Sequence, residues 1–548
     1  MRRRGFLKKL PIAAGASIML NNLPLSALAK SAPLYRLAAS SNNDRVLILI
    51  QLHGGNDGLN TVIPVDQYAE YYQLRPNLAI PDNGKRKFID LDSTLSVEDQ
   101  VGLHPDLTHM KELYDQGKLN IVQNVAYENV NGSHFRSRDI WFMGGDYNEY
   151  LPSGWMGRYL DYEYPGYPDD YPNTDMPDPL AIEIGNGVSL AFHRNNGIPT
   201  AISIQNPEQF YDLINSVGGA PPEYIANTHY GEELQWIMDI EEKSNQYAGR
   251  LKDVYEQGSN SQNVTYPELY PLNAPPGRIK NRLAPQLKMI ARLLSGGVKT
   301  KIFLARLGGF DTHAEQVEAY DATMGTHAAL LYHISSAMKA FQDDLKGLGL
   351  EDRVMTMTFS EFGRRAYSNG SYGSDHGTAA PMFVFGKMVK PGVTGTNPDL
   401  TNLNRGNLVH QFDYRQVFTS AVVDWLEADV DAVNATLFSD WVDSRLPIVG
   451  NGITGTTEEF FEERFYLDNC YPNPVKDNVV FGFRINSRGR VKLEILNIQG
   501  KLLNTVIDEV REAGFHQVTY NLSVLQTGPY LYRIKSGNLE NTKRLIKN

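Results

Sequence analysis

A near-continuous apolar run, RVLILIQL at residues 45–52, decides the fold class of this chain. A strand buried on both faces of a parallel sheet has no polar face, so its sequence is one hydrophobic run rather than an alternation. The run ends in HGGNDG at residues 53–58, where glycines allow a sharp turn and polar side chains follow at once. The stretch therefore predicts an inner parallel strand with a polar loop at its carboxyl end.

Five further apolar runs lie along the chain, at residues 119–126, 180–184, 301–307, 354–359 and 382–385. Helical patterns lie between them, and the clearest has an apolar stripe at spacings of three and four residues: Leu331, Ile334, Met338, Phe341 and Leu345. Alternating strands and helices predict a doubly wound, mostly parallel α/β sheet with helices on both sides. We assign this domain to residues 45–447.

The pattern changes after residue 447. A polar linker is expected at residues 448–464, and short alternating segments separated by turn residues follow it. These segments are residues 479–485, 491–497, 502–506, 516–522, 530–536 and 541–546. Short alternating strands joined by turns are typical of an antiparallel β-sandwich, which we assign to residues 465–548.

The amino terminus is typical of a signal peptide. Residues 1–9 are basic, residues 10–20 are apolar, and small residues follow up to Ala29. The motif RRGFLK at residues 3–8 resembles the twin-arginine core, although an ordinary secretory signal with a basic head fits as well. We expect a signal peptide at residues 1–30 and a linker at 31–44. No apolar run in the sequence reaches transmembrane length.

Composition narrows the functions that this chain can have. The net charge of −11 argues against a general affinity for nucleic acid or for anionic membranes. Cys470 is the single cysteine, which excludes an intrachain disulfide and any cysteine cluster for zinc or iron–sulfur. A metal site would therefore use histidine, carboxylate, amide or hydroxyl ligands.

Four loops at the ends of predicted strands carry carboxylate and imidazole groups. The candidate metal ligands in them are Asp57, Asp311, His313, Glu361, Asp375 and His376. Taken singly, each loop also fits a turn or a helix cap. Ligands bind at the carboxyl ends of strands in open α/β sheets, so four such loops together favour a shared site. These residue types hold zinc, manganese or similar divalent ions, and two ions would form a hydrolytic clamp.

A fifth segment, SHFRSRD at residues 133–139, follows the predicted strand 119–126. Ser133 is a candidate nucleophile, His134 a further ligand, and Arg136 a partner for an anion. The segment fits equally a helix start capped by Ser133. Arg364 is a second candidate for holding an anion. A Ser/His/Asp triad is disfavoured because no Gly-x-Ser-x-Gly elbow occurs in a strand–turn–helix setting.

Two resemblances sharpen these expectations. The carboxyl-terminal motifs resemble a type IX secretion sorting domain: YPNP at 471–474, NIQGK at 497–501, LQTGPYLYRI at 525–534 and KRLIK at 543–547. That resemblance implies transport across the outer membrane, with release or surface attachment. An adhesive or carbohydrate-binding sandwich is the alternative.

The large domain resembles domain of unknown function 1501, a family distantly similar to alkaline phosphatases and sulfatases. The segments that carry the resemblance are residues 53–61, 133–141, 308–316, 360–365 and 375–386. It implies a doubly wound sheet with a two-metal site, and twin-arginine signals are frequent in the family. Asp57 would match the first-strand aspartate and His376 the last histidine.

The sequence departs from the metal-site pattern of this superfamily in two loops. Asp311 and His313 resemble an Asp/His metal pair with tighter spacing, and Glu361 stands where an Asp-His pair is usual, with Phe362 replacing the histidine. One ion, different ions or lost catalysis are therefore all compatible with the sequence.

We therefore expect an exported metal-dependent hydrolase-like protein that acts on phosphate or sulfate esters of small molecules or glycans. The ligands above would bind zinc or manganese, Arg136 or Arg364 would hold the anion, and bound hydroxide or Ser133 would attack. The alternative is a non-catalytic surface or envelope binding protein on the same fold. Export would use the twin-arginine and type IX machineries through the periplasm, ending outside the cell or on its surface.

Overall fold

A computed structural model describes residues 19–20, 23–24, 43–195, 197–204, 247–450, 466–467, 470, 473–485, 488–512, 514–537 and 539–547. The chain forms two compact units, residues 1–453 and 454–548. Most of the expected signal peptide and of both linkers lies outside the described residues. The described part of the amino terminus pairs β1 (Met19–Leu20) with β2 (Leu23–Pro24).

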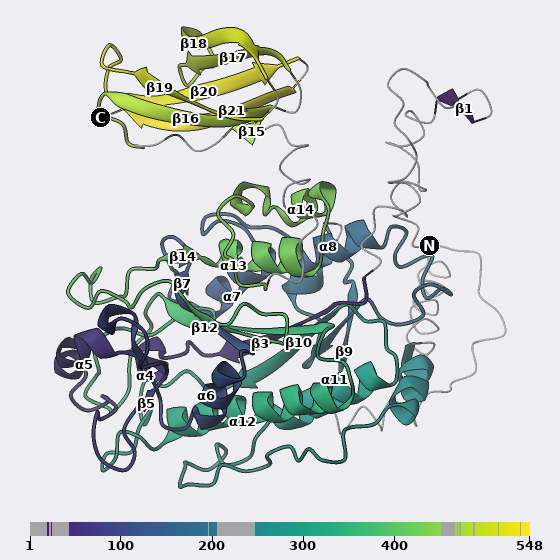
Figure 1. Cartoon of the computed structure of the whole chain (residues 1–548), viewed down its shortest axis with the longest axis vertical. Helices are drawn as coiled ribbons and strands as arrows, with labels where there is room; N and C mark the ends of the chain where they lie inside the picture. Colours follow the sequence, from purple (N-terminus) through teal and green to yellow (C-terminus); the bar gives the residue numbers. More distant parts are fainter. Residues whose placement is uncertain are drawn as a thin grey trace, which may run out of the picture. The chain divides into compact units, whose positions relative to one another are not determined.

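Strand β3 (Val46–His53) lies inside a sheet of nine described strands (Figure 1). The order across the sheet is β13 (Gly392–Thr394), β7 (Leu119–Ala126), β12 (Ala380–Phe385), β11 (Val354–Phe359), β3, β10 (Ile302–Gly308), β8 (Ala181–Ile184) and β9 (Ala201–Ile204), and β14 (Phe412–Asp413) pairs with β7. Parallel pairing joins β3 to β10 and β11, β8 to β9 and β10, and β7 to β13 and β14. The predicted mostly parallel α/β sheet is confirmed.

Strand β12 differs from the other inner strands because it runs antiparallel to both neighbours, β11 and β7. The loop from β11 to β12, residues 360–379, contains no helix. A parallel connection needs a crossover, usually a helix, so this loop returns the chain in the opposite direction. The residues just before β12 therefore lie at the same sheet edge as the residues just after β11 and β3.

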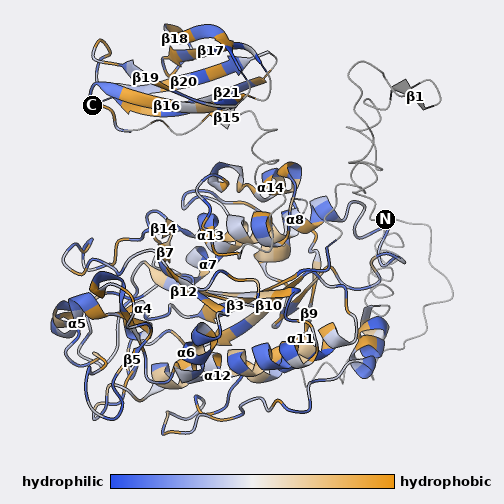
Figure 2. Cartoon of the chain, viewed as in Figure 1, coloured by the Kyte–Doolittle hydropathy of each residue, from blue (hydrophilic) through white to orange (hydrophobic). Residues whose placement is uncertain are grey.

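Helices cover both faces of the sheet (Figures 1 and 2). One face packs on α6 (Thr108–Asp115), α11 (Ala284–Ser295) and α12 (Thr326–Gly347). The predicted stripe on α12 is buried in this core. The other face packs on α7 (His134–Met143), α8 (Trp155–Glu163) and α13 (Tyr414–Ser420), through aromatic contacts such as Trp141 with Phe359.

Smaller elements complete this unit. A short antiparallel sheet contains β4 (Val62–Pro64), β5 (Ile89–Asp90) and β6 (Val101–Leu103). Further helical segments are α4 (Gly58–Thr61), η1 (Val65–Gln67), α5 (Tyr68–Leu74), η2 (Val97–Asp99), η3 (Leu190–Phe192), the π-helix η4 (Ala421–Trp425), α14 (Val430–Thr436) and η5 (Ser439–Trp441). Residues 247–257 are also helical. Among the described helices, none combines the length and apolarity that crossing a membrane requires.

The carboxyl-terminal unit consists of two antiparallel sheets. One contains β15 (Tyr466–Leu467), β16 (Asn478–Ile485) and β19 (Gly514–Asn521); the other contains β18 (Leu502–Arg511), β17 (Gly489–Leu496), β20 (Gly528–Ser536) and β21 (Leu539–Lys547). Alternate residues of both sheets, such as Phe481 and Ile534, form one buried core. The predicted antiparallel sandwich is confirmed.

Candidate metal centre

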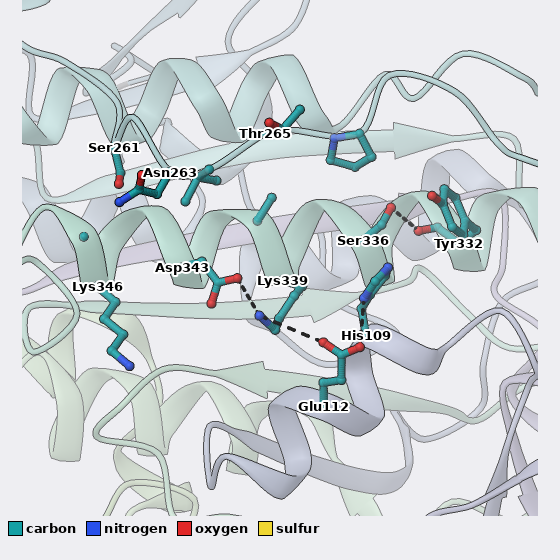
Figure 3. Close-up of a pocket in the computed structure, with 14 residues that line it drawn as sticks. His109, Glu112, Ser261, Asn263, Thr265, Tyr332, Ser336, Lys339, Asp343 and Lys346 are labelled. Atoms are coloured by element: carbon teal, nitrogen blue, oxygen red, sulfur yellow. Dashed lines mark hydrogen bonds and ion pairs between the residues drawn. The ribbon is translucent and has the colours of Figure 1, made fainter.

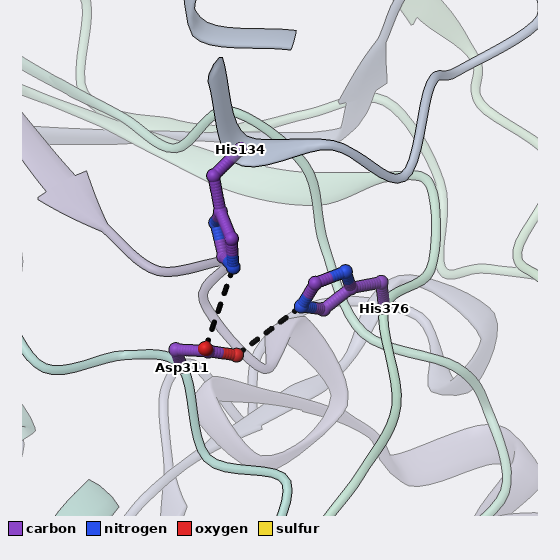
Figure 4. A group of neighbouring side chains, drawn as sticks. All are labelled: His134, Asp311 and His376. Atoms are coloured by element: carbon purple, nitrogen blue, oxygen red, sulfur yellow. Dashed lines mark hydrogen bonds and ion pairs between the residues drawn. The ribbon is translucent and has the colours of Figure 1, made fainter. Parts of the chain in front are cut away.

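Three side chains far apart in the sequence meet at the carboxyl edge of the large sheet (Figure 4). His134 begins α7, Asp311 follows β10, and His376 precedes β12. One ligand atom from each lies within 4.8 Å of the others, and both imidazoles point at the Asp311 carboxylate. Two imidazoles and a carboxylate are a donor set that suits zinc and related divalent ions.

Both imidazoles are oriented in the same way. His134 Nδ1 lies 2.8 Å from Glu361 Oε1, and His376 Nδ1 lies 2.8 Å from the Gly132 carbonyl oxygen. Their Nε2 atoms lie 3.4 and 3.2 Å from the Asp311 carboxylate. An Nδ1–H that donates to an acceptor leaves the Nε2 lone pair for a metal. In the tautomer that carries the proton on Nδ1, both rings present Nε2 toward Asp311.

The Asp311 carboxylate remains charged despite partial burial. Arg364 Nη2 and His313 Nδ1 each lie 2.8 Å from its Oδ1 atom. Burial raises the pKa of Asp311, but hydrogen bonds from Arg364 and His376 outweigh it and hold the pKa well below its usual range. His313 is 47% exposed and extends the cluster on its open side. The expectation that Asp311, His313 and His376 share a site agrees with this geometry.

Glu361 lies behind His134 rather than among the three grouped ligands. Its side chain is fully buried, and Oε1 accepts a hydrogen bond from Gly54 N at 2.8 Å in addition to the contact with His134. Burial raises the pKa of Glu361, but hydrogen bonds with His134 and His53 lower it to about 2. A charged carboxylate in this position raises the pKa of His134 and fixes its ring. Glu361 Oε2 is buried without a hydrogen-bond partner among the described residues, so the direct-ligand role of Glu361 stays a prediction.

The glycines of the first loop allow close packing under the cluster. A Cβ atom at Gly54 would lie 2.2 Å from the Asp311 nitrogen, and one at Gly55 would lie 2.6 Å from the Phe362 ring. Both glycines have positive φ angles, which other residues rarely adopt. The Phe362 ring in turn contacts the rings of His134 and His376, with centroids 4.9 and 4.5 Å apart.

Asp57 belongs to a separate, buried network. It caps α4, and both carboxylate oxygens accept hydrogen bonds from Arg75 Nη1 at 2.9 Å. Gln316 donates to Oδ2 at 2.5 Å. Burial raises the pKa of Asp57, but the charges of Arg75 and His327 lower it below its usual value. The expectation of a metal ligand is corrected, since the guanidinium occupies the position that a cation would need.

The two arginines expected to hold an anion are engaged elsewhere. Arg136 donates to the carbonyls of Tyr147 and Glu149 and stacks 3.8 Å above the Tyr150 ring. Arg364 is buried, and its nitrogens donate to main-chain carbonyls and to Asp311, so it braces the loops of the site. Both guanidinium groups therefore have partners within the protein.

The last two expected residues lie beside the cluster. Asp375 is exposed, and its carboxylate accepts from Asn369 at 3.2 Å, so it does not join the grouped ligands. Ser133 stands at the start of α7 and is exposed, without the expected side-chain capping hydrogen bond. Its place next to His134 leaves it a candidate nucleophile.

Sequence reasoning missed His53. Its Nδ1 atom lies 3.2 Å from Glu361 Oε1, and its ring centroid is 5.8 Å from that of His134. The signal was present, because His53 is the last residue of β3 and directly precedes the glycine loop. The sheet edge thus carries four imidazoles, His53, His134, His313 and His376.

A separate groove of about 640 Å³ lies over α6 and α12 and the chain at residues 261–267 (Figure 3). Lys339 lies between Asp343 and Glu112 in it, at 2.5 and 3.9 Å. The residues of the metal cluster do not line this groove. It adds nothing to the site at the sheet edge.

Comparison with known families agrees with both resemblances. Residues 232–415 match the family described as protein of unknown function (DUF1501), and residues 469–548 match the secretion system C-terminal sorting domain. The sorting domain implies export by the type IX machinery and a secreted or cell-surface location. Among proteins with curated descriptions, none matches this chain.

Solved structures that match this chain include a protein in the alkaline phosphatase superfamily and an alkaline phosphatase. A superfamily protein from Vibrio parahaemolyticus is 11% identical, with 81% of this chain and 76% of that chain covered and a TM-score of 0.28. Alkaline phosphatase from the Antarctic bacterium TAB5 is 11% identical, with coverages of 63% and 92% and a TM-score of 0.24. Dimeric latent PorU from Porphyromonas gingivalis is 23% identical over 15% of this chain and 9% of that chain, with a TM-score of 0.13.

Proposed function

We propose that the large unit is a metal-dependent hydrolase of phosphate or sulfate esters that acts outside the cell or on its surface. The observation that carries the proposal is the convergence of His134, Asp311 and His376, with both Nδ1 atoms already bonded. Orienting partners behind each histidine are a regular feature of protein metal sites. We further propose that residues 45–447 form this domain and that a twin-arginine signal exports it folded.

The residues of the cluster have distinct tasks in this proposal. His134, Asp311 and His376 hold the cation, and His313 completes the set from the open side. Glu361 and the Gly132 carbonyl orient the imidazoles, while Arg364 fixes the position of the Asp311 carboxylate. When bound, the divalent ion, zinc or manganese, supplies Lewis-acid stabilisation of charge on the non-bridging ester oxygens.

Ser133 is the candidate nucleophile, because it is exposed and adjoins His134. Attack by Ser133 Oγ on phosphorus or sulfur forms a new ester bond and expels the alcohol, and water then cleaves the serine ester. Direct attack by water is the alternative. A Ser133→Ala variant separates the two: turnover is lost in the first mechanism and persists in the second.

A second function, non-catalytic binding at the cell surface, is favoured by one observation. Both arginines expected to hold the anion, Arg136 and Arg364, are engaged by the protein itself. A fold of this class does not by itself fix an activity. The experiment below therefore treats binding without turnover as a defined result.

Metal analysis of the purified full chain, with aryl phosphate and aryl sulfate assays, tests the proposal. We expect close to one bound ion per cluster and turnover that Asp311→Ala abolishes. Asp375→Asn is the matched control, since Asp375 is exposed and outside the cluster, and it retains metal and activity. Protein that stays metal-free and inactive after addition of zinc or manganese contradicts the hydrolase. Metal binding without turnover of either ester supports the binding protein.

A further inference from the structure

A second group of polar side chains lies on the same face of the sheet as the metal cluster. Strand register places Arg306 beside Gln51 and Gly308 beside His53. Paired residues of neighbouring strands share a face, as do residues two apart along a strand. Gln51, His53, Arg306 and Gly308 therefore lie on one face, the side on which His53 meets His134.

The surface beside His53 is open. Gly308 is exposed, and a Cβ atom placed there would have no atom of the described chain within 4 Å. Gly187, in the loop that follows β8, is likewise exposed and open. Room for a ligand therefore begins next to the imidazoles and continues toward Arg306.

The Arg306 guanidinium is held by two side chains and is partly exposed to solvent. Its Nε atom donates to Gln51 Oε1 at 2.9 Å, and its Nη2 atom lies 3.3 Å from Glu183 Oε1. The Arg306 side chain is 33% exposed, whereas that of Glu183 is 1% exposed. A guanidinium held by buried partners with one edge in solvent is suited to bind an anion through two parallel hydrogen bonds. Arg364 lacks this open edge.

Arg138 is a second cationic side chain and lies on helix α7. It lies one turn after His134 on α7, so both side chains share a helix face. The Arg138 side chain is 28% exposed and pairs with its neighbour Asp139 at 3.2 Å. Burial raises the pKa of Glu183, and the charges of Arg306 and Arg138 both act against that rise. Arg306 is the cationic group in contact with Glu183, and Arg138 adds a further positive charge that acts on it.

An unpaired polar atom borders this region. Gln51 Nε2 is buried and has no hydrogen-bond partner within the described residues. Gln51 contacts Arg306, and the Ser189 nitrogen donates to Glu183 Oε2 at 2.7 Å. Buried polar atoms are seldom unpaired in native proteins, so the Gln51 amide indicates a polar group that the described residues do not supply.

We propose that Arg306, together with Arg138, forms an anion-binding subsite for a second acidic group of the substrate, apart from the ester held at the metal cluster. The subsite itself stands on the geometry of Arg306, Gln51 and Gly308. The conclusion on substrate class, an ester that carries a further sulfate, phosphate or carboxylate, rests also on the proposed hydrolase function.

Calorimetric titration of inorganic sulfate into metal-free full-length protein, at constant ionic strength, tests the subsite directly. We expect Arg306→Gln to weaken sulfate binding by about tenfold or more. Arg306→Lys keeps the charge but loses the planar fork, so it has an intermediate affinity. Arg138→Gln has a smaller effect. Arg353→Gln, before β11 at the opposite sheet edge, leaves sulfate binding unchanged.

Thermal unfolding of each variant shows whether it is folded, and only folded variants are compared. Wild-type protein that binds no sulfate overturns the subsite. So does a folded Arg306→Gln or Arg306→Lys variant with unchanged affinity. Loss of binding in Arg353→Gln to the same degree as in Arg306→Gln also overturns it, because the effect is then one of net charge.

A pair of aryl esters, one with a carboxylate on the ring and one without, tests the substrate class. We expect wild type to prefer the carboxylated ester in kcat/KM, and Arg306→Gln to remove that preference while leaving the other ester unaffected. Sulfate binding without turnover of either ester retains the subsite and rejects the hydrolase. Turnover without sulfate binding and without a preference rejects the subsite and retains the hydrolase.

Discussion

Asp57 and Asp311 occupy equivalent places in the fold and have opposite surroundings. Each stands in a glycine-containing loop directly after an inner strand, β3 or β10. Asp57 is buried and paired with Arg75, whereas Asp311 is 47% exposed and faces the imidazoles of three histidines. Strand topology thus brings a carboxylate to the sheet edge, but partners from other loops decide whether it is a structural ion pair or a candidate metal ligand.

The largest expected effect is on metal binding in Asp311→Ala. Removing the carboxylate that both Nε2 atoms face should reduce zinc and manganese affinity by more than about 100-fold, since even outer partners of ligands contribute 10–100-fold. The free energy of unfolding should fall by less than in Asp57→Ala, because Asp311 is half-exposed and the buried Arg364 keeps its main-chain carbonyl partners. Isothermal titration and urea unfolding measure the two quantities. Unchanged affinity would place the cation elsewhere.

For Asp57→Ala we expect the opposite pattern, in which the main effect is on the free energy of unfolding. Removal of one partner of a buried ion pair leaves Arg75 without its counter-charge and should destabilise the large unit by about 3–5 kcal/mol. All 5 tryptophans lie before residue 454, so their fluorescence during urea unfolding reports on this unit alone. Asp57→Ala combined with Arg75→Met should recover part of the loss. A single variant as stable as wild type would show that the pair is dispensable.

A smaller loss of metal affinity is expected for Glu361→Gln, which tests whether Glu361 orients His134. Weaker orientation of His134 should lower metal affinity by about 10–100-fold. If Glu361 acts through His134, the loss should vanish when His134 is already alanine. Titrations of the two single variants and the double variant form the cycle. Fully additive losses would instead make Glu361 a ligand in its own right.

The smallest effect concerns His327, which lies beside the Asp57 network and donates from Nε2 to Asn56 Oδ1 at 3.1 Å. Burial lowers the pKa of His327 to about 4, with Asp57 opposing the shift and Arg75 and Arg364 adding to it. The unfolded chain then takes up a proton near pH 6.5 that the folded chain does not, so stability falls as pH falls.

Between pH 8 and pH 5 this linkage should remove about 2 kcal/mol of stability from wild type. His327→Gln lacks the titrating group, so its free energy of unfolding should fall by about 2 kcal/mol less over the same interval. Urea unfolding followed by tryptophan fluorescence at both pH values measures the difference. Parallel pH profiles of wild type and variant would show that His327 is not held neutral.

Much of the fold was predictable because buried parallel strands have distinctive sequences. The runs at 119–126 and 354–359 coincide with β7 and β11. The direction of β12 was not predictable, since an apolar run carries no sign of strand direction. That direction matters, because it brings His376 to the edge where Asp311 lies.

The site was predictable in position and less so in detail. Asp311 and His313 lie at the carboxyl edge because they follow the parallel strand β10, and His376 joins them because β12 runs antiparallel. The partners of Asp57 and Arg136 come from Arg75 and Tyr147, in segments without a motif. Local spacing carries no information on such long-range pairs, so both roles required the folded structure.

Anomalous diffraction from crystals of the full chain grown with zinc, recorded at the zinc edge, tests the metal centre most directly. We predict one strong peak about 2.0–2.2 Å from His134 Nε2, His376 Nε2 and an Asp311 oxygen. A peak at another place in the chain, or none there at millimolar zinc, would contradict the proposed centre.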